Sequence, residues 1–310
     1  MWKYVLKRVL QLIPTFLFVS FIVFWLMSLS GDPASVVAGM DATPEDIEHL
    51  REAMGLNRNI FVRYGEYMFN LLRGDMGKDI YGNDVWELFS ERFPNTMILI
   101  LISITVSTVI AILAGVIAAL RKGSWTDTGL TVMCLFFNCM PVFWLGMILQ
   151  TLFAVKLGWL PTSGISKGLA VSLILPTAAS ALNSMAAKAR QTRSAMLDNL
   201  NADFMRTALA KGVRHKNAVY KHALPNAAIP IITVVGTAFA TSIGGSVALE
   251  TVFAWPGIGT LIVNGVSASN YPIVCGCVTV TLLLIGAINL IIDVAYAFAD
   301  PRIKARYTGK

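Results

Sequence analysis

Long uncharged apolar blocks separated by polar segments are the main pattern along this chain of 310 residues. A helix of about 20 apolar residues, rising roughly 1.5 Å per residue, crosses the ~30 Å hydrocarbon core of a membrane. Six blocks have that length: Val9–Leu29, Met97–Leu120, Leu130–Val155, Leu169–Ala187, Ala227–Leu249 and Pro272–Ala299. Barrel strands would alternate apolar and polar residues over about ten positions, and these blocks do not. The pattern therefore predicts an all-α membrane protein with six transmembrane helices.

Two of these blocks need a closer look. The fourth is interrupted by Pro176 and Asn183, but neighbouring helices can satisfy the backbone groups that such interruptions free. The first follows Lys3, Lys7 and Arg8, as a signal peptide would. Its apolar stretch exceeds the roughly 7–15 residues of a signal peptide and lacks a small-residue cleavage site. We therefore interpret it as an uncleaved first span.

A polar segment of residues 31–95 separates the first two blocks. Thr43 is suited to cap a helix that begins at Pro44 and stops at Gly55, and a second helix is predicted around Val62–Leu72. The segment is too small and too poor in apolar residues to be an independent domain. We therefore divide the chain into a cytoplasmic start with the first span (1–30), an extracytoplasmic segment (31–95) and a core of five spans (96–310).

Composition and charge support this assignment. Hydrophobic residues make up 55% and charged residues 14% of the chain, with a mean hydropathy of +0.65, whereas soluble proteins carry about 25% charged residues. About two thirds of the 25 lysines and arginines lie at the two ends, at Arg121–Lys122 and in residues 188–226. Residues 30–96 hold about two thirds of the 18 acidic residues. The positive-inside rule places both termini in the cytoplasm, so the net charge of +7 indicates orientation and we expect no nucleic-acid partner.

The basic segment between the fourth and fifth blocks, Lys188–Pro225, is longer than a helical hairpin requires. We predict a short helix with Asn201 as its N-cap and Gly212 just beyond its end, where a positive φ is common. A second helix is predicted over residues 216–224, ending before Pro225 because the residue before proline disfavours the α-helical conformation. The segment is therefore expected to have a fixed helical shape.

The first of these helices is amphipathic. Phe204, Ala208 and Leu209 lie on one face, with Met205 beside them. We predict no core on a six-span protein that could bury this face, so a protein partner is expected to cover it. The alternative is that the basic loop lies on anionic lipid, which needs no partner protein.

The same loop carries a specific spacing of residues. It reads Arg206-Thr207-Ala208, three residues, Gly212, nine residues, and then His222-x-Leu224-Pro225. This closely resembles the cytoplasmic EAA loop of ABC-importer permeases, whose pattern is E-A-A, three residues, G, nine residues and I-x-L-P. The chain departs from that pattern at its first two positions and at His222. The Arg-Thr-Ala variant is similar to the dipeptide, oligopeptide and nickel branch of these permeases.

Further motifs similar to that branch occur in order along most of the chain. They are Gly31-Asp32-Pro33, Met54–Asn57, Arg92–Thr96, Glu250–Gly259, Tyr271-Pro272-Ile273 and Asp300–Ile303. The resemblance implies a type I ABC-importer permease fold and a multi-pass position in the inner membrane, in contact with lipid. It also implies a second homologous permease subunit, two ABC ATPase subunits that bind ATP and Mg²⁺, and an extracytoplasmic substrate-binding protein.

The resemblance assigns a role to the loop of residues 199–225. It would dock on an ATPase subunit and transmit the ATP-driven closure of that subunit to the spans, which would alternate between outward and inward access. The docking residues would be Asp203, Phe204, Arg206, Thr207, Ala208, Lys211, Gly212, Leu224 and Pro225.

The outer motif, Glu250–Gly259, lies between the fifth and sixth spans. A tight turn is predicted there by Pro256, Gly257 and Gly259. Phe253 and Trp255 are expected at the depth of the lipid headgroups, either as interfacial anchors or as part of an outer gate. Glu250 is expected to be solvated at the end of the fifth span, or else to face the docked binding protein or the gate.

Few polar side chains lie inside the predicted spans. Asp293 is the only ionisable residue deep within one, and Asn289 precedes it by one turn on the same face. Because a charge in lipid is costly, we expect this pair to form a polar clamp with a neighbouring helix rather than a substrate contact. Asn138, Gln150 and Asn183 are candidates either for lining a pathway or for hydrogen bonds between helices.

Motifs for chemistry are absent from the sequence. It has no G-x-x-x-x-G-K-[ST] phosphate loop and no H-E-x-x-H motif, and its four cysteines fall within predicted spans without the spacing of a metal site. We therefore predict that the chain is not an enzyme and binds no cofactor or metal itself. The alternatives are a secondary transporter or channel not coupled to an ATPase, and a membrane-embedded enzyme. The substrate stays open among dipeptides, oligopeptides, glutathione, nickel and metallophores.

Overall fold

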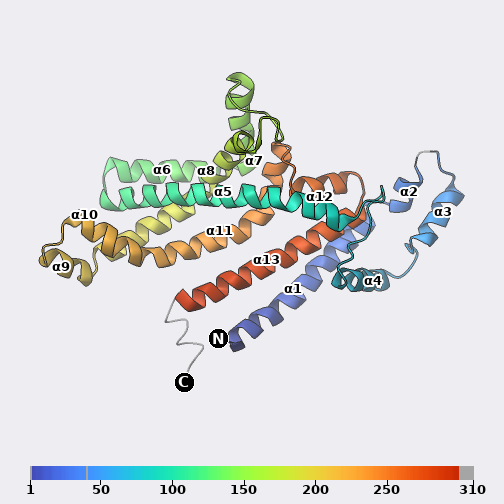
Figure 1. The fold of residues 1–310 in the computed structure, drawn as a ribbon, viewed down its shortest axis with the longest axis horizontal. Helices are drawn as coiled ribbons and strands as arrows, with labels where there is room; N and C mark the ends of the chain where they lie inside the picture. Colours follow the sequence, from blue (N-terminus) through green and yellow to red (C-terminus); the bar gives the residue numbers. More distant parts are fainter. Residues whose placement is uncertain (1, 40, 300–310) are drawn as a thin grey trace. The chain divides into compact units, whose positions relative to one another are not determined.

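The structure is a computed structural model that describes residues 2–39 and 41–299 (Figure 1). The long helices are α1 (Trp2–Leu29), α5 (Val85–Leu120), α8 (Leu169–Leu200), α11 (Leu224–Val252) and α13 (Tyr271–Ala299). The shorter ones are α2 (Pro33–Ala38), α3 (Pro44–Ala53), α4 (Ile60–Leu72), α6 (Trp125–Cys139), α7 (Val142–Leu149), α9 (Asp203–Ala210), α10 (His215–Ala218) and α12 (Ile258–Ser267). Two π-helical turns, η1 (Gln150–Lys156) and η2 (Val219–Ala223), complete the set. The predicted all-α fold class is confirmed.

Contacts divide the chain into two compact units, which we describe separately. The core unit comprises Met97–Trp255 and, at the end of the described chain, residues 291–299, and the flanking unit comprises Trp2–Thr96 and Pro256–Leu290. In the core unit, α8 packs against α6, α7 and α11, and α7 also contacts α11 (Figure 1). The core unit is therefore a helical bundle organised around α8.

Among the described residues, five helices are long and apolar enough to cross a membrane, and the number of such spans is six if α6 and the α7–η1 segment together form one. That pair is bent by 100°, so the third predicted span is two helices joined at a break and not one continuous helix. The bend falls at Met140, whose extended backbone (ψ 132°) precedes Pro141, as expected for the residue before a proline. Asn183 Nδ2 donates to the carbonyls of Phe137 (3.3 Å) and Met140 (2.7 Å), which the break leaves without helical partners.

α8 is much longer than the fourth apolar block. It continues beyond that block through residues 188–200, and Pro176 lies within it without ending it. The prediction that Lys188 begins a cytoplasmic loop is therefore wrong. Lys188 is only 1% exposed, because the helix carries it into the bundle, where its Nζ reaches Ser107 of α5.

The flanking unit contains both helices predicted in residues 31–95. α3 begins at a capping box in which Thr43 and Asp46 bond to each other's backbone N–H groups, and the hydrogen bond from the Thr43 side chain lowers the pKa of Asp46. α4 lies against α1, where the rings of Phe21 and Tyr64 meet edge to face with centroids 5.2 Å apart. The two helix predictions for this segment are confirmed.

Candidate coupling hairpin and polar cavity

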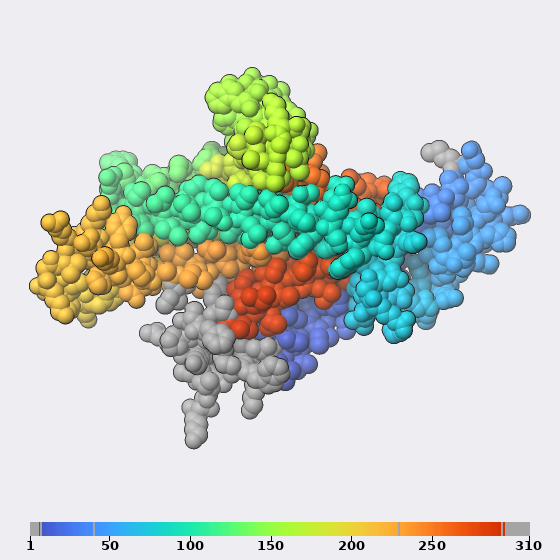
Figure 2. Space-filling view, viewed as in Figure 1, coloured from blue at the N-terminus to red at the C-terminus, as the bar shows by residue number. Residues whose placement is uncertain are grey.

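The α9–α10 hairpin, residues 201–223, connects α8 to α11 at one end of the core unit, where it is exposed (Figure 2). α9 lies within the predicted first helix, but the predicted N-cap is wrong. Asn201 is the C-cap of α8, and its side chain donates to the Leu197 carbonyl (2.9 Å). Ala202 precedes α9 instead, and no side chain caps that end. The unexpected length of α8 moves the helix boundary onto Asn201.

The turn after α9 depends on Gly212, whose φ of +81° confirms the predicted positive φ. Its N–H donates to the Leu209 carbonyl (2.9 Å), and the N–H of Val213 donates to the Ala208 carbonyl (3.1 Å). These bonds satisfy carbonyls that the end of a helix leaves without partners. A residue with a Cβ pays roughly 1–2 kcal/mol for this conformation, which is why glycine is suited to the position.

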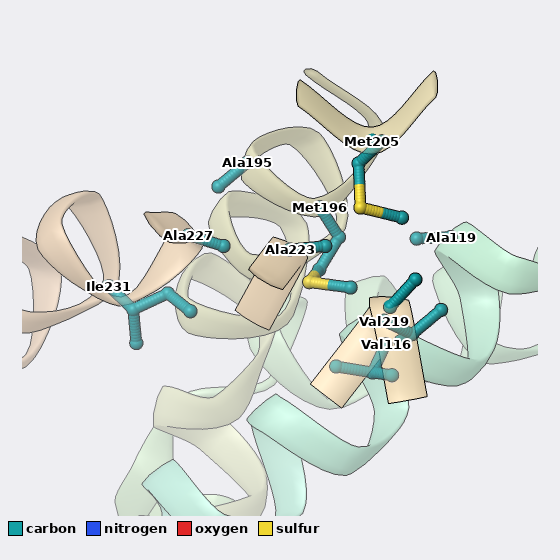
Figure 3. Packing of buried hydrophobic residues seen from close by; sticks show 10 residues of the cluster. Val116, Ala119, Ala195, Met196, Met205, Val219, Ala223, Ala227 and Ile231 are labelled. Carbon is teal, nitrogen blue, oxygen red and sulfur yellow. The ribbon is translucent and has the colours of Figure 1, made fainter. Parts of the chain in front are cut away.

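One face of α9 is buried in the protein's own core. Met205 is 1% exposed and belongs to a cluster with Met196 of α8, Ala119 of α5 and Val219 of η2. Figure 3 shows its side chain pointing into that cluster. The prediction that no core could receive the apolar side of this helix is therefore wrong for Met205. The extended α8 and the following η2 turn supply a core that the pattern of spans did not reveal.

Most of the remaining residues of α9 are exposed. Phe204 and Leu209 are 39% and 41% exposed, and the side chains of Asp203 and Arg206 are 99% and 80% exposed. Asp203 and Arg206 are 3.9 Å apart, and such an exposed pair contributes only about 0–1 kcal/mol to stability. Of the remaining predicted docking residues, Thr207, Lys211, Gly212 and Pro225 are exposed, whereas Ala208 and Leu224 are half-buried. The hairpin thus presents apolar side chains among charged ones.

The hairpin continues into α11 without a break. α10 passes into η2, and η2 passes into α11 at Leu224, so the predicted end of the second helix before Pro225 is wrong. In an α-helix a proline ring clashes with the carbonyl four residues earlier. Here the preceding turn is widened, with the Leu224 N–H donating to the Val219 carbonyl five residues back, and Pro225 falls in the first turn of α11.

The residues of the outer motif are divided between the two units. Glu250 and Trp255 of the core unit are both 0% exposed, and Trp255 packs against Leu99 and Leu173. Phe253 is buried as well. The expectation of a solvated Glu250 is therefore wrong, because this side chain lies in the interior of the core unit. Phe253 and Trp255 are buried there too, and their predicted depth at the lipid headgroups and their role in an outer gate stay predictions.

Pro256, Gly257 and Gly259 belong to the flanking unit, where they begin α12 rather than form a tight turn between two spans. The Gly257 N–H donates to Thr260 Oγ1 (3.2 Å) at the start of that helix. Asn95 Nδ2 donates to the Pro256 carbonyl (2.8 Å). The segment is therefore a helix start that is tied to α5.

A polar cavity of about 170 Å³ lies within the core unit. Seven of its twelve lining residues have small polar side chains, and the others include Leu99, Ile100, Val142 and Leu249. The seven are Ser103 of α5, Ser180, Asn183 and Ser184 of α8, and Thr241, Ser242 and Ser246 of α11. Such side chains can both donate and accept hydrogen bonds, and none of them carries a charge. The cavity is therefore suited to a polar ligand group.

Of the five polar residues proposed for the spans, the four whose side chains the structure describes do not gather at this cavity. Asn183 alone among the described side chains of that set lines it, and the same residue bonds to the broken end of α6. Asn138 is exposed, and Asn289 is half-buried in the flanking unit. The side chain of Asp293 lies outside the described residues. Gln150 Nε2 donates to the Thr162 carbonyl (2.5 Å), which makes it a contact between chain segments.

Lys188 is the residue near this cavity that sequence reasoning missed. Its Nζ donates to Ser107 Oγ and, at 3.5 Å, to Ser184 Oγ, and Ser184 lines the cavity. A charged residue lowers the mean hydropathy of any window that contains it, so the hydropathy pattern places Lys188 after the fourth apolar block, in the loop that follows. The signal that could have found it is helix continuity, since residues 188–200 contain no glycine or proline.

Two family models match the chain. The one described as "Binding-protein-dependent transport system inner membrane component" matches residues 111–305, and the one for the N-terminal part of such components matches residues 1–100. Together they cover both units.

Curated relatives are similar over nearly their whole length. A putative peptide transport system permease protein of Brucella abortus (strain 2308) is 39% identical, over 97% of this chain and 98% of the relative. The oligopeptide transport system permease protein AppB of Bacillus subtilis (strain 168) is 37% identical, over 98% and 100%. The glutathione transport system permease protein GsiC of Escherichia coli O6:H1 is 38% identical, over 98% and 99%.

Solved structures share the fold of part of the chain. The inward-facing MetNI methionine ABC transporter superposes with a TM-score of 0.58 at 17% identity, covering 69% of this chain and 96% of the matched chain. An amino acid ABC transporter crystallised with histidines gives a TM-score of 0.51 at 14% identity, covering 68% and 93%. At these identities the likeness shows the fold alone.

Proposed function

The chain belongs to the family of binding-protein-dependent transport system inner membrane components and is a permease subunit of an ABC importer, and from that premise we propose that its cargo is short peptides. It is a multi-pass protein of the inner membrane. The observation that carries the proposal is the polar cavity of the core unit, which would be this chain's half of the translocation pathway.

The lining of the cavity fits a peptide by its chemistry. A peptide backbone presents alternating N–H and C=O groups, and hydroxyl and amide side chains can pair with both. The seven polar side chains of the wall recognise no particular side chain, which suits cargo of variable sequence. The relatives named for peptide, oligopeptide and glutathione transport point the same way. Nickel or a metal chelate is the alternative cargo, since a chelated metal brings its own ligands.

The exposed face of the α9–α10 hairpin is our proposed docking surface for an ABC ATPase subunit. Phe204 would insert into a groove of the ATPase, flanked by the charges of Asp203 and Arg206. An apolar anchor within a polar rim is the usual composition of a protein interface. The complete importer would contain a second homologous permease subunit, two ATPase subunits and an extracytoplasmic binding protein.

This assembly requires a defined orientation. The hairpin and both termini would lie in the cytoplasm, where the ATPase subunits bind ATP and Mg²⁺, and residues 31–95 would face the binding protein. Catalysis would belong to the ATPase subunits, and this chain would bind neither nucleotide nor metal. The basic side chains of the cytoplasmic side would in addition contact anionic lipid.

Purification and uptake test the proposal together. We expect the tagged chain to co-purify with an ABC ATPase, and its deletion to abolish uptake of radiolabelled tripeptide while nickel uptake is unchanged. Transport of peptide by the purified chain alone, driven by a proton or sodium gradient, would instead establish a secondary transporter. Loss of nickel uptake with normal peptide uptake would refute the peptide assignment but leave the ABC permease role intact.

A further inference from the structure

Lys188 is a buried cation at mid-depth of the core unit. Its side chain is 1% exposed, and its ammonium group donates to Ser107 Oγ of α5 and to Ser184 Oγ of α8 (3.5 Å). Ser107 lies near the middle of the apolar block Met97–Leu120. A charge at such a depth is costly unless it is paired, and it is therefore usually functional.

Hydroxyl groups are the acceptors around this ammonium group. The Ser107 hydroxyl donates its own hydrogen to the Ile104 carbonyl (3.0 Å), so its oxygen is free to accept from Lys188. Such bonds solvate a cation but leave its charge uncompensated. Within the described part of the chain, Lys188 has no carboxylate partner, and its third ammonium hydrogen has no acceptor.

The same helix carries a second cation whose charge is neutralised by a carboxylate of the chain itself. Arg193 of α8 forms a bidentate ion pair with Asp127 of α6, at 2.6 and 2.7 Å. A bidentate pair neutralises the charge and fixes the two helices together. Lys188, which is more deeply buried than Arg193, has no such partner among the described side chains. The difference points to an anion that arrives from outside the chain.

The polar cavity lies next to this cation. Ser184, which accepts a hydrogen bond from Lys188, lines the cavity, and so does Ser103, one turn before Ser107 on α5. Ser103 is 3% exposed, and its hydroxyl has no hydrogen-bond partner within the described residues. Buried hydroxyl groups are normally paired. An unused hydroxyl donor thus lies in the cavity wall, and an uncompensated cation lies within hydrogen-bond distance of another residue of that wall, Ser184.

We propose that Lys188, together with Ser103 and Ser184, forms a subsite that receives the carboxylate of a peptide during translocation, an inference that rests on the proposed peptide cargo. A carboxylate offers two acceptor oxygens, which match the free ammonium hydrogen and the unused Ser103 hydroxyl. The flexible four-carbon stem of the lysine lets its ammonium group turn from Ser107 toward the cavity. A cavity of about 170 Å³ accommodates the end of a peptide rather than a long chain.

The test compares trialanine with its C-terminal amide in proteoliposomes that contain the complete importer. Both peptides are supplied at concentrations that saturate the binding protein, so that the uptake rate reports the membrane step. Lys188→Met removes the charge and keeps much of the apolar stem. We expect it to lower the ratio of acid to amide uptake about tenfold, because a hydrogen bond to a charged group is strong. Equal slowing of both peptides, or an unchanged ratio, would overturn the subsite and leave Lys188 a helix-packing residue.

Two further variants keep the test decisive. Ser103→Ala removes a hydroxyl that supports no other described group, and we expect it to lower the acid-to-amide ratio about two- to fivefold. If Lys188→Met does not assemble, an unchanged ratio in Ser103→Ala overturns the proposal. Lys156→Met, at an exposed lysine in η1, is the matched control for the loss of one positive charge and should leave the ratio unchanged. Failure of the wild-type importer to transport either peptide would instead refute the proposed function.

Discussion

Replacing two neighbouring residues of α9 separates the support of the hairpin from its docking surface. Met205 is 1% exposed and packed in the core cluster, whereas the side chain of the preceding residue, Phe204, is 39% exposed. Met205→Ala should loosen the hairpin, and Phe204→Ala should leave it in place. Both substitutions should reduce peptide uptake, for different reasons.

The expected magnitudes follow from burial. Met205→Ala removes three heavy atoms from a packed site, which costs roughly 2 kcal/mol of transfer free energy and on the order of 1 kcal/mol for the cavity that remains. A loss of about 3 kcal/mol raises the population of the opened hairpin on the order of 100-fold. Phe204→Ala changes a surface position, where the effect on stability is within about 0.5 kcal/mol.

Hydrogen exchange measured by mass spectrometry on the assembled importer reads these effects directly. Amides of Asp203–Lys211 should exchange on the order of 100-fold faster in Met205→Ala and within about threefold of wild type in Phe204→Ala. Uptake per ATP hydrolysed should fall in Phe204→Ala despite normal exchange. Unchanged exchange in Met205→Ala would refute the assignment of the buried face, and normal coupled uptake in Phe204→Ala would refute the docking role.

Three further predictions test separate parts of the core unit. Gly212→Ala should destabilise the turn by about 1–2 kcal/mol, through the positive φ alone, because nothing lies within 4 Å of the added Cβ. Gly212→Asn should destabilise it by less, because asparagine tolerates a positive φ. The rate of peptide uptake should therefore fall from the wild type to the asparagine variant and further to the alanine variant. Asn183→Leu should leave two carbonyls at the α6 break unpaired, at about 1–3 kcal/mol each, and lower the melting temperature of the purified permease. Gly115→Ala should reduce the amount of folded protein in the membrane, because the added Cβ would lie 2.6 Å from the Cβ of Thr192. Gly129→Ala is the control and should not reduce it, because nothing lies within 4 Å of the Cβ added there.

Local signals in the sequence predicted the elements that depend on local physics. The capping residues before α3 and the glycine after α9 determine backbone conformation within a few residues, and both predictions are confirmed. Span length follows from the thickness of the hydrocarbon core, so the five long helices were predictable as well. These features do not depend on which helices pack together.

Features that depend on tertiary packing were not predictable from the same signals. Hydropathy treats a residue at the end of an apolar block as a surface residue, yet Lys188, Glu250 and Trp255 are all fully or almost fully buried. The bend at Met140 requires Asn183, 43 residues later, to satisfy its carbonyl, and a pattern read along the chain does not show that contact. For the same reason the sequence placed Asn183 among pathway candidates but gave no sign of the cavity formed by α5, α8 and α11.

The connection between the hairpin and the cavity gives the predicted docking role a physical route. Met205 packs in a cluster that includes Ala227 of α11, so the hairpin and the start of α11 share one core. α11 then runs without interruption to Thr241 in the cavity wall, about 14 residues or roughly 21 Å further along. The irregular step in this route is η2, where the wider turn before Pro225 stands in place of a helix break. Because α11 continues as one helix through Pro225 and Pro230, a displacement of the hairpin by a docked ATPase would act on the cavity wall along a continuous helix.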